Sequence, residues 1–260
     1  MGHFLTLLVL SLLHINGHLG MDIIGGNEVA PHSRPYMVFL KSSGSCGGAL
    51  IKSNWILTAA HCNVANTSYA ILGAHRLQDT QEQQQIRIKR GIKYPCYDKD
   101  LGINDLQLLQ LEKPAKMNKF VSLLSLPKNE ENIAAKKICS AAGWGISDLR
   151  KRTTSDVLRE VKLAIVDNEV CKKEYSKKKK FITDNMLCAG SPSKKHKADT
   201  CAGDSGGPLI CDGKYVGLVS FGPPDCGNPK FPGVYTRLTN NYLKWIRNTI
   251  GGDYSDIYRI

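Results

Sequence analysis

Short apolar runs separated by turn residues dominate the chain from residue 23 onward. Runs of this kind predict β-strands that form a sandwich or a pair of barrels. Near the C-terminus the pattern changes, because Tyr242 to Ile250 carries apolar residues at helical spacing and Gly251 and Gly252 would end a helix. We therefore expect an all-β fold with a C-terminal helix, its two halves linked by the polar stretch 127–133. The expected strands cover 36–40, 48–51, 55–57, 69–72, 106–111, 215–220 and 233–236.

The first 22 residues differ from the rest. Phe4 to Leu13 is a nearly unbroken apolar segment, long enough for the core of a signal peptide and too short to span a bilayer. We expect a signal peptide over 1–20 that is removed after Gly20, with Gly17 as the alternative cleavage position; a buried N-terminal helix is the other interpretation. A signal peptide implies a secreted protein.

The number of cysteines agrees with secretion, and the net charge indicates the kind of partner. The chain has nine cysteines, a usual number for a disulfide-bonded extracellular domain, and the odd count leaves one thiol without an internal partner. The formal net charge is +12. A basic surface of this size indicates an anionic partner such as a sulfated glycan, a membrane surface or a nucleic acid, without choosing among them.

Three segments carry residues suited to nucleophilic catalysis. His61 lies in Thr58–Cys62, Asp105 lies between Asn104 and Leu106, and Ser205 lies in the glycine-rich stretch 203–208. Each segment alone is weak evidence, since single histidines and serines are common. Together, in the order His, Asp, Ser, they match the catalytic triad of chymotrypsin.

Five motifs in the expected order extend this match along the chain. IIGG, LTAAHC, NDLQLL, GWG and DTCAGDSGGPL stand between Ile23 and about Ile250, and the chain resembles the trypsin-like (chymotrypsin-fold) serine proteases. The resemblance implies two packed six-stranded antiparallel β-barrels and a protease domain over 23–260. It implies that His61 is the general base, that Asp105 orients it, and that Ser205 is the nucleophile. The backbone N–H groups of Gly203 and Ser205 would form the oxyanion hole.

The resemblance also implies activation by cleavage before Ile23. The freed α-amine would insert and pair with Asp204, and residues 21–22 would be a dipeptide propeptide. No Lys or Arg precedes Ile23, so cleavage by a trypsin-like enzyme is disfavoured. The acidic-ended dipeptide is similar to that of granule proteases, which a dipeptidyl peptidase removes.

Substrate preference follows from the same resemblance. Asp199 stands six positions before the nucleophile, where the family places the base of the primary specificity pocket. A carboxylate there selects Lys or Arg. Gly222 and Gly233 match the small wall residues, and Ser220 and Gly222 lie where substrate backbone pairs as an added strand. No metal or cofactor is expected, because Ala74 replaces the carboxylate of the family's calcium loop and Pro232 replaces an aromatic residue of sodium-regulated members.

The family pattern leaves one cysteine over. Cys96 is the expected unpaired thiol and the expected site of an interchain bond, and Asn66 begins an N-glycosylation sequon. The pairs implied by the resemblance are Cys46–Cys62, Cys139–Cys211, Cys171–Cys188 and Cys201–Cys226.

Within the family, the segments IIGGNEVAPHSRPYMV, YPCYD and FITDNMLCAG resemble the granzymes, particularly the tryptases of types A and K. This implies a granule protease of cytotoxic lymphocytes that forms a disulfide-linked homodimer, is stored on a sulfated proteoglycan and meets serpin-type inhibitors. Two alternatives remain open: an extracellular trypsin-like protease of mast-cell, plasma or digestive type, and an inactive protein that binds heparin or a target without cutting it.

Overall fold

The computed structural model describes residues 23–42, 44–65, 67–193 and 195–251. The expected signal peptide, the dipeptide 21–22, Asn66 and the tail after Gly251 lie outside the described residues. No helix in the described part of the chain is long and apolar enough to cross a membrane.

The first half of the chain forms a closed six-stranded barrel. All neighbouring strands are antiparallel, and the order around the barrel is β2-β3-β4-β7-β6-β5. Alternation of buried and exposed side chains explains β6, in which Ile86 and Ile88 point inward and Arg87 and Lys89 point outward. The strands are β2 (Met37–Lys41), β3 (Ser45–Lys52), β4 (Trp55–Thr58), β5 (Tyr69–Leu72), β6 (Gln84–Lys93) and β7 (Gln107–Leu111).

The second half forms another closed barrel, because β8 pairs with both β11 and β13 and so completes a ring of six antiparallel strands. Two short strands lie outside the ring. β1 (Asn27–Glu28) pairs with β11, and β9 (Ile146–Asp148) forms a hairpin with β10 (Thr153–Thr154). The expected pair of six-stranded barrels is confirmed. The ring contains β8 (Ile138–Gly143), β11 (Arg159–Val166), β12 (Met186–Gly190), β15 (Gly233–Arg237), β14 (Lys214–Phe221) and β13 (Pro208–Cys211).

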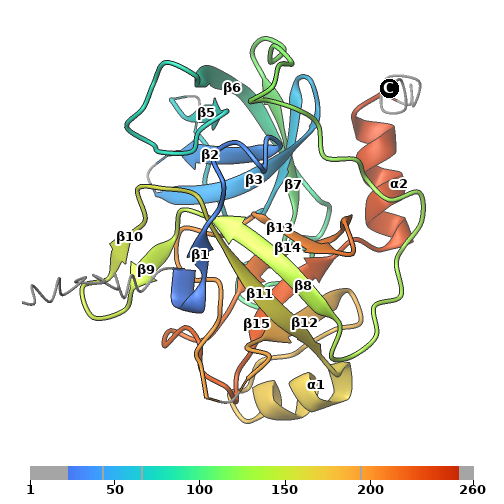
Figure 1. Cartoon of the computed structure of the whole chain (residues 1–260). Helices are drawn as coiled ribbons and strands as arrows, with labels where there is room; N and C mark the ends of the chain where they lie inside the picture. Colours follow the sequence, from blue (N-terminus) through green and yellow to red (C-terminus); the bar gives the residue numbers. More distant parts are fainter. Residues whose placement is uncertain (1–22, 43, 66, 194, 252–260) are drawn as a thin grey trace, which may run out of the picture.

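Two α-helices flank the barrels (Figure 1). The expected C-terminal helix is α2 (Asn240–Thr249), capped by the Thr239 hydroxyl, and its buried residues belong to the core cluster of the first barrel. Helix α1 (Asn168–Ser176), capped by Asp167, was not expected. It buries only Cys171 and Tyr175, so its apolar pattern is too sparse to reveal a helix in the sequence.

The segment between β7 and β8 crosses from one barrel to the other and contains the polar stretch 127–133 (Figure 1). It is attached to the start of α2, since the Glu130 backbone N–H donates to Asn240 Oδ1 at 2.8 Å and the Glu130 carboxylate pairs with Arg237 at 2.8 Å. The two halves are thus joined covalently by this linker, and α2 packs noncovalently against the first barrel.

Disulfides connect strands and loops around the site described below. Cys96 is exposed and is the free cysteine among the described residues. The four bonds, Cys46–Cys62, Cys139–Cys211, Cys171–Cys188 and Cys201–Cys226, are the pairs that the resemblance implies.

Candidate active site

Asp105 and His61 are joined where two neighbouring strands of the first barrel meet. β4 and β7 pair with Thr58 opposite Gln107, so the turn after β4 lies beside the residue before β7. His61 Nδ1 lies 2.8 Å from Asp105 Oδ2, and the His61 backbone N–H donates to Asp105 Oδ1 at 2.9 Å. The Gln107 side-chain amide donates to the Ala59 and Cys62 carbonyls and fixes the turn that carries His61.

Asp105 is only 2% exposed, and its environment favours the charged carboxylate. Burial alone would raise the pKa, but the hydrogen bond and the charge of His61, together with the Ser220 hydroxyl, outweigh burial and hold the pKa of Asp105 below its usual value. Ser220 donates to Asp105 Oδ2 at 2.6 Å. An ionised Asp105 only accepts hydrogen bonds, so the proton shared by the two residues resides on His61 Nδ1.

The loop that carries Ser205 packs closely against β3 and β4 of the first barrel. Gly206 has φ +80°, and a Cβ there would lie 2.0 Å from Thr58 Oγ1, so only glycine allows the serine loop to approach β4. The Gly47 N–H donates to the Ser205 carbonyl at 2.8 Å, which holds the loop on β3. No hydrogen bond between His61 and the Ser205 hydroxyl is found among the described residues.

The Asp204 carboxylate determines the shape of the loop before Ser205. It accepts hydrogen bonds from the Gly145 and Cys201 backbone N–H groups at 2.8 and 2.9 Å. Asp204 is fully buried, and burial raises the pKa of its carboxyl to about 6. Gly203 has φ +102°, and a Cβ there would come within 2.8 Å of Gly145 Cα. These contacts fix the orientation of the Gly203 and Ser205 N–H groups. Ile23, also fully buried, lies in the core cluster of the second barrel.

A cavity of about 210 Å³ opens at Ser205. Gly222 and Gly233 lie on its walls, and a Cβ on Gly222 would lie 3.8 Å from Gly233 Cα. A Cβ on Gly233 would lie 2.9 Å from Asp199 Oδ1, which places that oxygen directly behind the wall. The cavity is lined by Arg152, Thr200, Cys201, Ala202, Ser205, Val219, Ser220, Phe221, Gly222, Pro223, Pro224, Cys226 and Gly233.

Asp199 is 2% exposed, and only one of its two carboxylate oxygens has a hydrogen-bond partner. Its Oδ2 accepts the Gly227 N–H at 2.8 Å, whereas the buried Oδ1 has no hydrogen-bond partner in the described structure. Burial raises the pKa of this carboxyl to about 7. A buried acceptor without a partner is costly, so a hydrogen-bond donor that reached Oδ1 would offset this cost.

A second cavity, of about 350 Å³, shares the segment Ser220–Gly222 with the first and is also lined by His61 and Asp105. Several residues that line the second cavity, and Arg152 of the first cavity, were not predicted from the sequence as site residues. In the sequence, only the glycine at position 102 hinted at this cavity. It has φ +67°, and a Cβ there would lie 2.9 Å from the Phe221 ring, so glycine keeps this cavity open. The residues not identified are Tyr97, Lys99, Gly102, Lys180 and Phe221.

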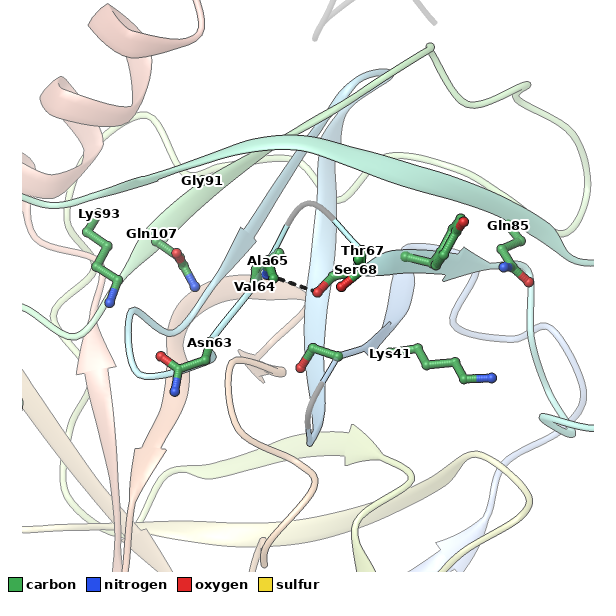
Figure 2. A pocket seen from close by; sticks show the side chains of 12 residues that line it. Lys41, Asn63, Val64, Ala65, Thr67, Ser68, Gln85, Gly91, Lys93 and Gln107 are labelled. Carbon is green, nitrogen blue, oxygen red and sulfur yellow. Dashed lines mark hydrogen bonds between the residues drawn. The ribbon is translucent and has the colours of Figure 1, made fainter.

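Larger cavities lie elsewhere in the molecule. One of about 660 Å³ is lined by Lys41, Asn63, Thr67 and other residues. Figure 2 draws these residues, and a dashed line marks the hydrogen bond from the Ala65 N–H to Ser68 Oγ. Another, of about 1310 Å³, borders the segment Ile24–Ala30. Neither cavity is lined by His61, Asp105 or Ser205, so cavity volume alone does not locate the candidate site.

One group of metal-ligating side chains is present among the described residues: Cys46, Cys62 and His61. The two cysteines are bonded to each other, and His61 is held by Asp105, so the donors do not fit a metal ion.

A partly exposed histidine held by a buried aspartate, and a glycine-framed serine on a loop that packs against the same barrel, are the features expected of a serine protease of the trypsin fold. The sequence model of the family described as Trypsin matches residues 23–246. The chain belongs to the trypsin family of serine proteases.

Individual relatives agree with this assignment. Granzyme A of Bos taurus is 45% identical over 232 residues, which cover 88% of each chain. Mast cell protease 3 of Ovis aries is 42% identical over 95% of this chain and 96% of its own length. The solved structure of neuropsin, a serine protease expressed in the limbic system of mouse brain, superimposes with a TM-score of 0.78 at 35% identity, covering 87% of this chain and 99% of that one.

Proposed function

We propose that the protein is an endopeptidase that cuts after Lys or Arg through His61, Asp105 and Ser205. The observation that carries the proposal is the buried, half-satisfied carboxylate of Asp199 behind the wall of the cavity at Ser205. A Lys or Arg side chain in that cavity supplies the missing donor and the compensating charge.

The reaction divides into two steps. His61 Nε2 removes the Ser205 proton as Oγ attacks the scissile carbonyl, and the same proton then goes to the leaving amine, so that an acyl-enzyme remains. Water, deprotonated by His61, releases the acid and restores Ser205. Asp105 stabilises the imidazolium in both steps. The Gly203 and Ser205 N–H groups bind the oxyanion, each contributing about 3 kcal/mol to transition-state stabilisation.

Activation is proposed to follow cleavage before Ile23. Ile23 is fully buried, and so is Asp204, whose raised pKa reflects an uncompensated buried charge. A freed α-amine at Ile23 that pairs with Asp204 would offset that burial. Because Asp204 also binds Gly145 and Cys201, the same pair would fix the oxyanion loop.

The cellular role is proposed from the relatives. Similarity to granzyme A and to mast cell protease 3 supports a granule protease, and a secreted extracellular trypsin-like protease remains the alternative. Exposed Cys96 supports a disulfide-linked homodimer, and the formal net charge of +12 supports storage on a sulfated proteoglycan. Serpin-type inhibitors are the expected regulators.

A peptide panel that varies only the residue before the cut tests the proposal. The assay uses protein that has been processed to begin at Ile23, and the Ser205→Ala variant of the same protein is the control. Hydrolysis confined to Lys and Arg peptides, and lost in the control, supports the proposed triad and pocket. Efficient cleavage after apolar residues contradicts the role of Asp199, and unchanged activity in Ser205→Ala contradicts the nucleophile.

A further inference from the structure

The cavity of about 660 Å³ drawn in Figure 2 is connected to the proposed catalytic histidine through one side chain, that of Gln107. The Gln107 amide nitrogen donates to the Ala59 carbonyl at 2.8 Å and to the Cys62 carbonyl at 2.7 Å. These two carbonyls lie on either side of His61 in the chain. Because Gln107 also lines the cavity, a ligand bound there would touch the side chain that fixes the turn of His61.

The amide oxygen of Gln107 is open to the cavity. Gln107 is only 2% exposed, and its amide nitrogen is already engaged by the two carbonyls. A Cβ on Gly91 would lie 3.2 Å from Gln107 Oε1, and Gly91 lines the same cavity, so the absence of a side chain there leaves the oxygen uncovered. No donor to Oε1 is found among the described residues. A nearly buried acceptor in this position favours a ligand that brings a hydroxyl or an N–H group.

The charged side chains of the cavity are both positive. Lys41 and Lys93 are exposed, and no Asp or Glu lines the cavity in the part of the chain that the structure describes. Lys93 lies 5.0 Å from the centre of the Tyr97 ring, and neither lysine pairs with a carboxylate of the described residues. Figure 2 shows Lys93 toward the Gln107 side of the cavity and Lys41 toward the Gln85 side. Both sides therefore attract an anionic group.

Uncharged polar side chains complete the lining. Asn63, Thr67 and Gln85 are exposed at the cavity and offer both donors and acceptors, and the partly buried Val64 adds an apolar surface. A sugar ring has the matching groups, since its hydroxyls donate and accept and its C–H faces are apolar. The volume lies within the range of cavities that hold small molecules. Hydroxyls together with one anionic group describe a sulfated sugar.

We propose that this cavity binds a sulfated sugar, with a sugar hydroxyl donating to Gln107 Oε1 and the sulfate contacting Lys93. The inference rests on the proposed function, in which a sulfated glycan is held by overall charge, and adds to it a defined site and an effect on catalysis. A hydrogen bond to Oε1 polarises the Gln107 amide and strengthens its donation to the Ala59 and Cys62 carbonyls. The occupied cavity therefore steadies the turn that carries His61.

Calorimetric titration of the Ser205→Ala variant, processed to begin at Ile23, tests the binding. The probes are 6-sulfated N-acetylglucosamine, neutral N-acetylglucosamine and inorganic sulfate. We expect the sulfated sugar to bind at least about tenfold more tightly than either of the others, since it alone offers both hydroxyls and an anion. No binding of the sulfated sugar overturns the proposal. Equal affinity for inorganic sulfate also overturns it, because the lysines would then attract any anion.

Substitutions in the Ser205→Ala protein locate the site. Lys93→Gln should weaken binding of the sulfated sugar about fivefold. Gly91→Ala, whose methyl group would lie against Gln107 Oε1, should weaken it about tenfold, and Lys93→Gln decides alone if that variant does not fold. Lys89→Gln is the matched control, since Lys89 is an exposed lysine of the same strand that does not line the cavity. An equal loss in Lys89→Gln and Lys93→Gln would assign binding to the general charge of β6 and contradict the site.

The effect on His61 has its own readouts. A saturating concentration of the sulfated sugar should raise kcat of the active enzyme about twofold for an Arg peptide and leave KM unchanged, because the ligand acts on the turn and not on the substrate pocket. In the Ser205→Ala variant, the NMR signals of the His61 ring should shift as the sugar binds. Binding that leaves kcat and these signals unchanged contradicts the connection through Gln107. A protein that cuts no Arg peptide contradicts the proposed function, whereas titration and NMR still decide this inference.

Discussion

The Ser220 hydroxyl donates a hydrogen bond of 2.6 Å to Asp105 Oδ2, the same carboxylate oxygen that lies 2.8 Å from His61 Nδ1. Ser220 was expected from the sequence to contact substrate backbone. Its main chain lies along both cavities at the site, while its side chain supports the orienting carboxylate. One residue of β14 in the second barrel therefore stabilises an acid of the first barrel.

We expect Ser220→Ala to lower kcat/KM by about tenfold, because a hydrogen bond to a buried carboxylate is lost. The pKa of Asp105 should rise as well, which NMR titration of its carboxyl measures. Thr236→Val is the matched control, since the Thr236 hydroxyl bonds to the Asp105 backbone carbonyl and not to its carboxylate. An unchanged pKa of Asp105 in Ser220→Ala would show that Asp105 does not need this donor.

Asp199 should make the binding of cations depend on pH near neutrality. Its carboxyl has a pKa of about 7, so it becomes neutral as the pH falls through that value and attracts a cation less strongly. In the Ser205→Ala variant, an arginine-like amidine should bind up to about tenfold more weakly for each pH unit below 7. Calorimetric titration between pH 8 and 5 measures this effect. A constant affinity over that range contradicts a titrating Asp199.

The same raised pKa has a consequence for stability. The folded protein binds this proton more tightly than the unfolded chain, so stability falls as the pH rises from about 4 to about 7. Asp199→Ser should therefore lose Lys and Arg cleavage while its melting temperature at pH 8 is equal to or above that of the wild type. A strongly lowered melting temperature would show that Asp199 stabilises the fold.

Asp204→Asn should lower kcat/KM by at least about 100-fold in protein that begins at Ile23, because the buried pairing with the α-amine is lost. Asp212→Asn is the control, since Asp212 is an exposed acid of the same barrel that pairs with Lys137. Circular dichroism checks that both variants fold. Full activity of Asp204→Asn would refute the proposed activation mechanism.

Cys96→Ser should migrate as a monomer on a non-reducing gel, whereas the wild type should migrate as a dimer that reducing agent separates. The thiol is exposed, and the substitution leaves the Cys96 carbonyl, which accepts from the Asn104 side chain at 3.0 Å. Sedimentation of both proteins tests whether a noncovalent dimer persists. Wild-type protein that is monomeric without reductant contradicts the interchain bond.

Parts of the fold were predictable because local patterns were strong. The apolar runs at 55–57 and 69–72 gave β4 and β5 nearly to the residue, and α2 was expected from its helical spacing. β8 and β12 were not expected, because both are rich in small residues. β11 was not expected either, since its alternation includes partly buried polar side chains. Local propensity is weak in such segments, and pairing with neighbouring strands decides them.

The sequence by itself determined the chemical types at the site: the order of His61, Asp105 and Ser205, the acid at Asp199 and the glycines around the serine. These follow from motifs whose spacing is local. Only the tertiary structure decided that the Ser220 side chain faces Asp105, that Asp199 Oδ1 is buried without a partner, and that Arg152 lines the cavity at Ser205. Each depends on segments distant in the chain being packed together, and burial and the cost of unpaired polar groups arise only from that packing.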